Sequence, residues 1–481
     1  MWIIAIICIY FAILMLISKL TQRRADNQTF FRAERRSPWY MVAFGMIGAS
    51  ISGVTFVSVP GMVLSSQMTY LQTCLGFILG YLVVAFVLLP VYYRLNLISI
   101  YTYLGQRLGH RSYQTGAWFF LLSKLVGAAV KFYVVCIVLQ QFVFDDLGVP
   151  FVVSVLGMAL LIWLYTRKGG VRTLVFTDTF QTVCLFSALL LIIYIAMGQM
   201  DYSLVDAYHA VSSDERSRVF VLDDWTSPRY FWKQFLSGAF IVIVMTGLDQ
   251  DMMQKNLTCR TLREAQKDMC SYGLAFVPVN LLFLALGVLL AQLFEAQGIS
   301  FPVKGDELLP LFVEGNHSPH ISHLLPLIFT LGIVAASFSS ADSALTSLTT
   351  SYCVDIRNKP HDEQLRKRSH IVICLLFAVM IILFQMLNSK SLIDAIYTIV
   401  SYTYGPLLGL FAFGLFTKKQ VRDKWVPLVC VASPFICYGI DLVAQTLWDY
   451  HFGYELLMLN GLLTFLGLCL LIRSAECQSP S

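Results

Sequence analysis

Hydroxyl side chains recur at helical spacing within an apolar stretch of the chain, Leu331 to Asp355. The small side chains that share one helix face there, at i, i+3, i+4, i+7 and i+11, are Ala336, Ser339, Ser340, Ser343 and Ser347. Such a face either packs closely against a second helix or supplies oxygen ligands to a cation. Asp342 lies in the same stretch and favours the cation site, because an ionisable side chain at membrane depth marks a functional site.

Three more ionisable side chains lie in other apolar stretches. Lys124 and Lys131 are seven residues apart, so they share a helix face, and Asp178 lies near the start of a further stretch. A lysine in the middle of a bilayer is costly unless it pairs with a carboxylate or binds an anionic solute. Asp178 is therefore expected either to pair with one of these lysines or to bind a cation.

Glycine and proline interrupt the apolar run of residues 38–64. The interrupting residues are Gly45, Gly48, Gly53, Pro60 and Gly61. Glycine weakens helices and proline removes an N–H donor, so an unbroken helix is not expected here. A broken helix frees carbonyls that bind ions or solutes, whereas a kinked helix would only allow close packing. The nearby hydroxyls of Ser50, Ser52 and Thr55 favour a binding site.

A second interruption is expected in residues 231–254, with a role in gating or coupling. Its residues are Gly247, Asp249 and Gln250. Asp249 and Asp251 lie next to a basic segment that begins at Lys255, so the alternative is a solvated helix end. That alternative is favoured for Asp251.

The composition is that of an integral membrane protein. Of the 481 residues, 57% are hydrophobic and 13% are charged, and the mean hydropathy is +0.69. A soluble domain is roughly a quarter charged, so an all-α membrane protein is predicted. The twelve cysteines include no CxxC pair, which indicates buried small side chains rather than disulfides or metal ligands. Neither a nucleic-acid partner, nor an ATP-driven pump, nor an enzyme is indicated by any motif.

Apolar runs long enough to cross a bilayer recur at about thirteen places. They cover residues 2–19, 38–64, 70–95, 113–144, 149–166, 174–198, 231–254, 268–297, 321–351, 369–388, 391–417, 424–447 and 454–473. Lysine and arginine clusters fall in alternate loops between these runs. The positive-inside rule then places the N-terminus outside and the C-terminus in the cytoplasm of a multi-pass protein of the plasma (cell inner) membrane.

Five motifs resemble those of the sodium:solute symporter family, in family order and over nearly the whole chain. They are GASISGVTFVSVPG (Gly48–Gly61), TDTFQ (Thr177–Gln181), GLDQDMMQKNLTCRTLREAQK (Gly247–Lys267), AxxSS (Ala336, Ser339, Ser340) and YGPLLGLFAFGLF (Tyr404–Phe416). Ser52 and Thr55 are closer to the branch that carries sialic acid, monocarboxylates and vitamins than to the sugar branch, which has an amide side chain at the position of Thr55.

The resemblance implies a leucine-transporter-type fold, with two inverted five-helix repeats and a discontinuous first helix in each. One repeat would cover residues 38–198 and the other residues 231–417. Residues 1–37 would add one span and a cytoplasmic loop. Residues 424–481 would add two spans and a short cytoplasmic tail.

The resemblance also implies that sodium is the coupling ion. The main site would use carbonyls and hydroxyls of Gly48, Ile51, Ala336, Ser339 and Ser340. Some members hold a second cation, which here would lie near Asp178, Asp342 and Ser343. Asp342 stands where a hydroxyl is expected, so it would strengthen that site, bind a proton or pair with a lysine.

The implied function is sodium-coupled import of a small organic solute by alternating access, without a protein partner. A carboxylate such as sialic acid or a monocarboxylate is expected, because Lys124 or Lys131 would supply the counter-charge. The other residues expected at the solute site are Ser50, Ser52, Thr55, Tyr70, Phe77 and Tyr402. Sugar or amino-acid symport is the alternative, followed by a transporter-like sensor.

Overall fold

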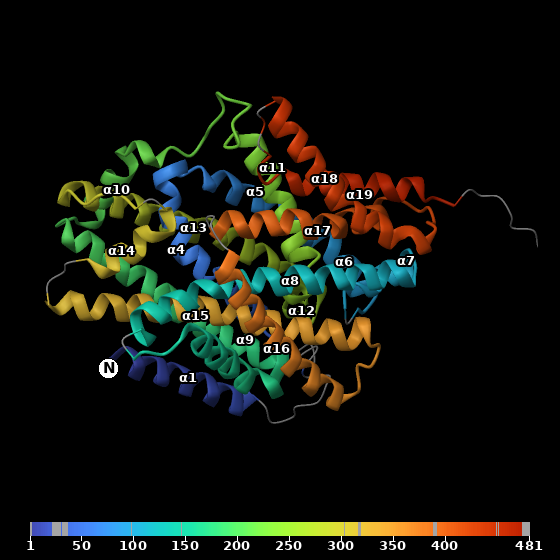
Figure 1. The fold of residues 1–481 in the computed structure, drawn as a ribbon, viewed down its shortest axis with the longest axis horizontal. Coiled ribbons are helices and arrows are strands. Elements are labelled where there is room, and N and C mark those ends of the chain that lie inside the picture. Colours follow the sequence, from blue (N-terminus) through green and yellow to red (C-terminus); the bar gives the residue numbers. More distant parts are fainter. Residues whose placement is uncertain are drawn as a thin grey trace, which may run out of the picture.

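All regular elements in the described part of the chain are helices (Figure 1), as the composition predicts. The computed structural model describes residues 2–21, 30, 37–97, 99–145, 147–302, 304–315, 319–387, 392–448, 450 and 452–473. The predicted loop after the first span lies mostly outside these ranges, as does the predicted C-terminal tail.

The α-helices follow one another with short connections. In chain order they are α1 (Trp2–Thr21), α3 (Trp39–Ser50), α4 (Gly53–Ser66), α5 (Tyr70–Val83), α6 (Leu89–Arg94), α7 (Thr102–Arg107), α8 (His110–Leu139), α9 (Phe151–Gln199), α10 (Leu204–Ser213), α11 (Phe231–Val242), α12 (Gln250–Asn256), α13 (Leu262–Gln297), α14 (Leu308–Glu314), α15 (Pro319–Ser351), α16 (Glu363–Leu387), α17 (Leu392–Phe416), α18 (Val426–Trp448) and α19 (Leu456–Leu470). Short π-helical segments extend four of them: η2 (Val84–Leu88), η3 (Gln140–Phe144), η5 (Ile243–Gly247) and η7 (Tyr352–Ile356).

Among the described residues, nine helices are long and apolar enough to cross a membrane, and two bent helix pairs raise the number to eleven. Two shorter apolar helices, Phe151–Arg167 and Leu456–Leu470, fall at the remaining predicted runs. The multi-span helical architecture is therefore confirmed, while the count of thirteen spans and the inverted repeats stay predictions.

Both expected interruptions are present as sharp bends. α3 and α4 are bent by 62° relative to each other, and α11 with η5 is bent by 69° relative to α12. At the first bend Ile51 and Ser52 have extended backbone angles, with ψ of 94° and 174°. The helical hydrogen-bond ladder stops there, so the last carbonyls of α3 lack the N–H groups that a continuing helix would supply.

Two glycines near the first bend allow neighbouring helices to come close. A Cβ on Gly48 would lie 1.9 Å from Oγ1 of Thr182 on α9, and one on Gly53 would lie 2.2 Å from Oγ of Ser337 on α15. Any larger side chain would push these helices apart. Close packing and a broken helix therefore occur together in residues 38–64.

The predicted basic loop between the spans at 149–166 and 174–198 is reduced to a kink within α9. Gly170 has φ of 51° there, a conformation that L side chains rarely adopt. Among the described residues of α9, Gly170 is the one with non-helical backbone angles.

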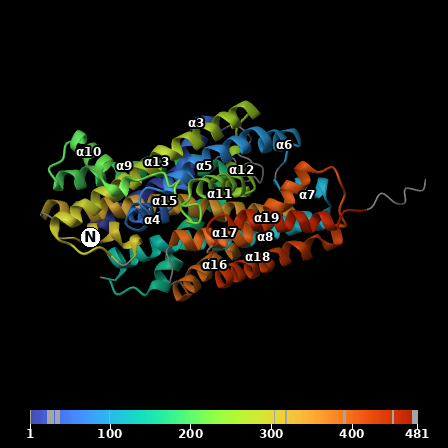
Figure 2. The same cartoon turned by 90° about the horizontal axis from the view of Figure 1, so that it is seen from above.

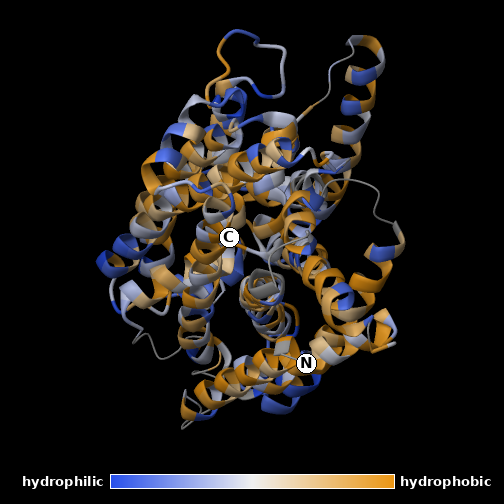
Figure 3. Ribbon diagram, turned by 90° about the vertical axis from the view of Figure 1, so that its left-hand side faces the viewer, coloured by the Kyte–Doolittle hydropathy of each residue, from blue (hydrophilic) through white to orange (hydrophobic). Residues whose placement is uncertain are grey.

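α15 packs against α9, α8, α3 and α16, which makes it the central helix of the bundle. α1 lies along one edge of the molecule and α18 and α19 towards the opposite edge in Figure 1. Seen from above in Figure 2, α16 and α18 lie along one edge and α3 and α6 along the other. Apolar residues dominate the outer helix faces (Figure 3), with large exposed side chains such as Leu190 and Phe435. Such a surface matches the hydrocarbon core of a bilayer.

Candidate functional site

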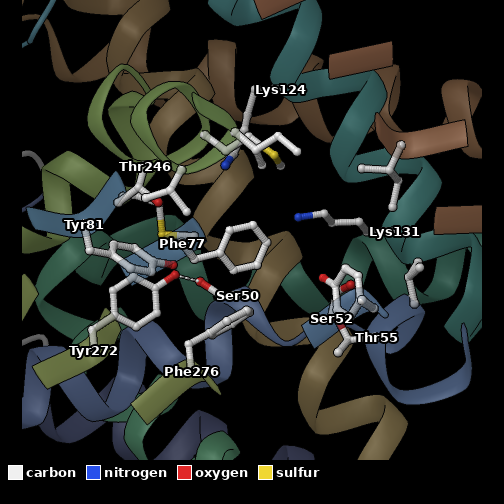
Figure 4. Close-up of a pocket in the computed structure, with 17 residues that line it drawn as sticks. Ser50, Ser52, Thr55, Phe77, Tyr81, Lys124, Lys131, Thr246, Tyr272 and Phe276 are labelled. Carbon is white, nitrogen blue, oxygen red and sulfur yellow. Dashed lines mark hydrogen bonds between the residues drawn. The ribbon is translucent and has the colours of Figure 1, made fainter. Parts of the chain in front are cut away.

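A cavity of about 100 Å³ lies beside the bend between α3 and α4. Predicted residues that line it are Ser50, Ser52, Thr55, Tyr70, Phe77, Lys124 and Lys131, most of them shown in Figure 4. They come from α3, α4, α5 and α8, so the structure brings together residues that are up to 81 positions apart in the sequence.

Tyr402 does not line this cavity. Its ring centroid lies 6.2 Å from that of Tyr438, and its hydroxyl lies 3.5 Å from Oδ2 of Asp441, both on α18. On α17 the residues that line a small interior pocket are Ile396, Val400 and Tyr404, each about one turn from the next. Tyr402 is two positions from Tyr404 and therefore points to another side of the helix.

Lys124 is paired with two carboxylates of α12. Its Nζ lies 3.1 Å from Oδ2 of Asp249 and 2.7 Å from Oδ2 of Asp251. The hydroxyl of Tyr404 also donates a hydrogen bond to Asp249 at 2.7 Å. Both aspartates are buried, with exposed fractions of 1% and 4%, so the solvated helix end favoured for Asp251 is not what the structure shows.

Lys131 lies two turns further along α8 and also faces the cavity (Figure 4). Unlike Lys124, it forms no ion pair and no hydrogen bond with the described residues. A largely buried ammonium without a carboxylate is unfavourable unless an anion compensates its charge. The cavity is therefore electropositive at Lys131.

The N-terminus of α4 adds donors on the same side of the cavity. Ser52 precedes the helix, and its hydroxyl makes no capping hydrogen bond. Thr55 lies in the first turn, and the side chains of Ser52 and Thr55 lie near Lys131 in Figure 4. Free N–H groups at a helix N-terminus carry a partial positive charge. The two hydroxyls, the N-terminus of α4 and the Lys131 ammonium together favour the binding of an anionic group in this part of the cavity.

Aromatic side chains form the opposite wall. Tyr81 and Tyr272 pack with ring centroids 4.6 Å apart, and the Tyr272 hydroxyl is hydrogen-bonded to that of Ser50. Phe77 and Phe276 complete this wall, with centroids 5.6 Å apart. Tyr81, Tyr272 and Phe276 were not predicted. Aromatics at i and i+4 on α5 and α13 were the available signal, but that spacing is equally typical of helix packing.

The first bend and α15 meet where the main sodium site is expected. Oγ of Ser340 donates a 2.7 Å hydrogen bond to the carbonyl of Ala49, which lies between Gly48 and the bend. Ile51, Ala336 and Ser339 are buried around this contact. Neutral carbonyl and hydroxyl oxygens are ligands that suit a hard monovalent cation, so the predicted residues fit sodium chemically.

Ser339, on the neighbouring position of α15, points to a buried acid instead. Its Oγ donates to Oδ1 of Asp178 at 2.8 Å, and Oδ2 of Asp178 lies 2.7 Å from Nζ of Lys255. Lys255 was expected to begin a basic loop, yet only 2% of it is exposed. The sequence placed it next to other cations, and only the bend before α12 carries it into the bundle.

Asp342 lies in the same buried region. The hydroxyl of Tyr165 donates to its Oδ2 at 2.8 Å, while Oδ1 and the hydroxyl of Ser343 have no hydrogen-bond partner in the described part of the chain. Lys255 is close enough for an electrostatic interaction with Asp342, but its ion pair is with Asp178. The carboxylates of Asp178 and Asp342 thus face one ammonium, that of Lys255. One further cation would neutralise the remaining negative charge.

The carbonyls at the second bend are already hydrogen-bonded. Tyr92 donates to the carbonyl of Gly247 at 2.8 Å, and Tyr101 donates to that of Leu248 at 2.9 Å. The side chain of Gln250 accepts the backbone N–H of Ile100 at 3.0 Å. This bend is therefore fixed to the segment between α6 and α7, which suits a structural hinge better than an ion site.

Comparisons with known proteins agree with this architecture. The sequence model of the sodium:solute symporter family matches residues 30–423. The sodium/sialic acid symporter SiaT of Proteus mirabilis (strain HI4320) is 24% identical over 464 residues, covering 90% of this chain and 89% of that protein. The sodium/iodide cotransporter of Homo sapiens is 25% identical over 419 residues, covering 82% of this chain and 62% of that protein.

A solved structure of a Na⁺-coupled sialic acid symporter in a substrate-bound, outward-open state has the same fold. It aligns with a TM-score of 0.82 at 20% identity, over 98% of this chain and 97% of that one. The leucine-transporter-type fold is thereby confirmed. The similar proteins are transporters and not enzymes.

Proposed function

Because this chain belongs to the sodium:solute symporter family, we propose that it imports a small organic carboxylate together with sodium by alternating access. The proposal that the solute is a carboxylate rests on Lys131. Its ammonium group faces the cavity and forms no ion pair with a carboxylate among the described residues. Lys124, the other candidate, already compensates the charge of Asp249 and Asp251. Lys131 is therefore the lysine that binds the solute.

The carboxylate would sit between Lys131 and the start of α4. Ser52 and Thr55 would donate hydrogen bonds to its oxygens, together with N–H groups of the first turn. The remaining body of the solute would face the aromatic wall that includes Phe77 and Phe276. At about 100 Å³, the cavity is below the roughly 300 Å³ at which pockets for drug-sized ligands begin, which favours a compact monocarboxylate.

Sodium would bind where α15 meets the end of α3. Its ligands would be the carbonyls of Gly48, Ile51 and Ala336 and the hydroxyls of Ser339 and Ser340. An ion in this place joins the two helices, and it binds best in the conformation in which they are close. Solute affinity and sodium affinity then depend on the same conformational equilibrium, so each ligand tightens the other.

A second cation would be held near Asp178, Asp342 and Ser343, where a buried carboxylate oxygen and a hydroxyl lack partners in the described chain. Each charge that enters across a 100 mV potential contributes about 2.3 kcal/mol to uptake. Gly247, Asp249 and Gln250 would act as the hinge of α12 in the transition.

The orientation that goes with import places the basic loops in the cytoplasm of a cell inner membrane, the N-terminus outside and the C-terminus inside. The proposed repeats are residues 38–198 and 231–417, flanked by residues 1–37 and 424–481. Lipid is the only further partner that the apolar outer surface requires.

Uptake into proteoliposomes tests the proposal. Sodium gradients are applied while a panel of monocarboxylates, sialic acid, biotin-like acids, neutral sugars, amino acids and iodide is offered. We expect uptake of a carboxylate only with inward sodium, and Ser339→Ala/Ser340→Ala is expected to abolish the sodium dependence while the protein still inserts and folds. Sodium-dependent uptake of a neutral sugar, or sodium dependence that survives in the double variant, would overturn the proposal.

A further inference from the structure

A second, much larger groove opens on the outside of the bundle between α8, the end of α15 and α16. Its volume is about 590 Å³, in the range of pockets that take drug-sized ligands. The aliphatic residues along its walls include Leu121, Leu122, Leu125, Leu348, Val372 and Leu376. Leu348 is buried at the floor, whereas Leu122 and Val372 are about half exposed at the rim. The groove is therefore an apolar channel open towards the membrane.

The groove runs along α16 from a charged end to the apolar interior. Its lining residues on α16 run from Leu365 past Arg368 and Ser369 to Leu376, and Arg368 lies eight residues before Leu376. Eight residues correspond to about 12 Å at 1.5 Å per residue. One leaflet contributes about 15 Å of hydrocarbon, half of the bilayer core. The groove thus spans most of one leaflet, which is the depth that a single acyl chain occupies.

Arg368, at the mouth of the groove, is unpaired among the residues that the structure describes. α16 carries three consecutive basic residues, of which Arg366 stacks 4.4 Å above the ring of Phe30 and Lys367 lies 3.3 Å from Glu363. Arg368 is exposed, lines the groove, and has no hydrogen bond or ion pair with the residues that the structure describes. An unpaired guanidinium at the end of an apolar channel is complementary to a phosphate attached to a hydrocarbon chain.

We infer that this groove is a binding site for one anionic phospholipid. Its acyl chain lies along the leucines of α8 and α16, and its phosphate is held by Arg368, next to Ser369 and the side chain of Tyr352. Basic pockets between membrane helices, at the side where lysine and arginine gather, have the chemistry that binds lipid head groups.

The site joins helices that the proposed transport cycle uses. Leu121 and Leu125 flank Lys124 on α8, and Leu348 lies on the same helix as Ser339 and Ser340. A lipid that touches α8, α15 and α16 at once stabilises the conformation in which they are packed as seen here. This role is independent of which solute is carried.

Thermal unfolding of the purified full-length protein in detergent tests the inference, because a ligand that binds the folded state raises the unfolding temperature. The probes are phosphatidylglycerol and phosphatidylcholine with identical acyl chains. We expect phosphatidylglycerol to stabilise the protein at lower concentration than phosphatidylcholine. Arg368→Gln is expected to remove that difference, with an apparent affinity for phosphatidylglycerol reduced about ten-fold or more.

Two further variants separate the site from a general charge effect. Lys367→Gln removes a neighbouring cation that is already paired, and it is expected to retain the preference for phosphatidylglycerol. Leu122→Trp fills the exposed rim of the groove and is expected to weaken the binding of both lipids. Equal stabilisation of the wild type by the two lipids, or the same loss in Lys367→Gln as in Arg368→Gln, would overturn the inference. A change from monomer to dimer that fills the groove, seen by light scattering, would also overturn it.

Discussion

Lys124 and Lys131 are the same residue type on the same helix face, yet the structure uses them in opposite ways. Lys124 is held between Asp249 and Asp251, with Nζ 2.7 Å from the nearer carboxylate. Lys131 borders the same cavity and lines a small pocket with Asp249 and Asp251, but it forms no ion pair with the described residues. The difference arises at the start of α12, where Asp249 and Asp251 lie within ion-pair distance of Lys124 and not of Lys131.

The comparison separates two ways in which a membrane protein can keep a buried charge. A pair within the protein compensates its own charges, and removing one partner destabilises the fold because the other charge is left buried without a counter-charge. An unpaired charge reduces stability and is tolerated because a ligand compensates it. Structural and functional lysines can therefore be told apart by their partners, and not by their depth in the membrane.

Removing Lys124 is expected to have the largest effect. Lys124→Met leaves two buried carboxylates without a cation, which should destabilise the folded protein by about 3–5 kcal/mol. Thermal unfolding in detergent measures this loss. The matched variant Lys124→Met/Asp249→Asn/Asp251→Asn removes the unpaired charges and should regain most of the stability. A single variant as stable as the wild type would show that the pairs are not structural.

Removing Lys131 should reduce the affinity for the solute rather than the stability of the fold. Lys131→Met is expected to weaken binding of the carboxylate by about 10- to 100-fold, the value of a hydrogen bond to a charged group. The unfolding temperature should not fall, and it should rise if the unpaired charge destabilises the solute-free protein. Lys131→Arg keeps the charge and serves as the control, with affinity close to normal. If Lys131→Met binds normally, or unfolds as readily as Lys124→Met, the two lysines do not differ as described.

Tyr404 sharpens the comparison, because it supports only the paired lysine. Tyr404→Phe removes the hydroxyl that donates to Asp249 at 2.7 Å. The expected destabilisation is about 1.5 kcal/mol. Solute affinity, measured by uptake at varied concentration, should not change. A loss of affinity without a loss of stability would place Tyr404 in the solute site instead.

An ion pair outside the membrane should contribute least to the stability of the fold. In the segment after α10, Asp214 binds Arg216 with a closest separation of 2.9 Å, and Arg216 also reaches Glu295 at 2.8 Å. Partial burial raises the pKa of Asp214, but hydrogen bonds from Arg216 outweigh it and leave the pKa below its usual value. Because a partly exposed pair is screened by water, its contribution should be about 1 kcal/mol or less.

The pH dependence of that pair has a defined sign. A carboxylate with a lowered folded-state pKa adds stability above its unfolded pKa of about 3.9 and loses it as the pH falls through the lower value. The difference in unfolding temperature between wild type and Asp214→Asn should therefore be present at neutral pH, shrink in strong acid, and shrink with added salt. If Asp214→Asn lowered the unfolding temperature as much as Lys124→Met, an ion pair exposed to water would matter as much as one buried in the membrane, which would contradict this prediction.

Much of the architecture could be predicted from local sequence. Apolar length and loop charge predict a multi-span helical protein, and both bends fall at predicted interruptions, after Ser50 and after Gly247. The hydroxyl ladder on α15 was also visible, because i, i+4 spacing puts Ser339, Ser343 and Ser347 on one helix face whatever surrounds them. Tyr402 was misplaced because its span was identified, while the side of the helix that faces the bundle was not.

The sequence by itself determined where helices form and break, since these depend on residues within one or two turns. It did not determine which charges pair. Lys124 and Asp249 are 125 positions apart, and Lys255 and Asp178 meet only because α12 is bent into the bundle. Coulomb interactions act over a few ångströms in a medium of low dielectric constant, so a shift of one helical turn would exchange the partners. Tertiary packing therefore decided that Lys124 is ion-paired, and that Lys131 forms no ion pair with the described residues.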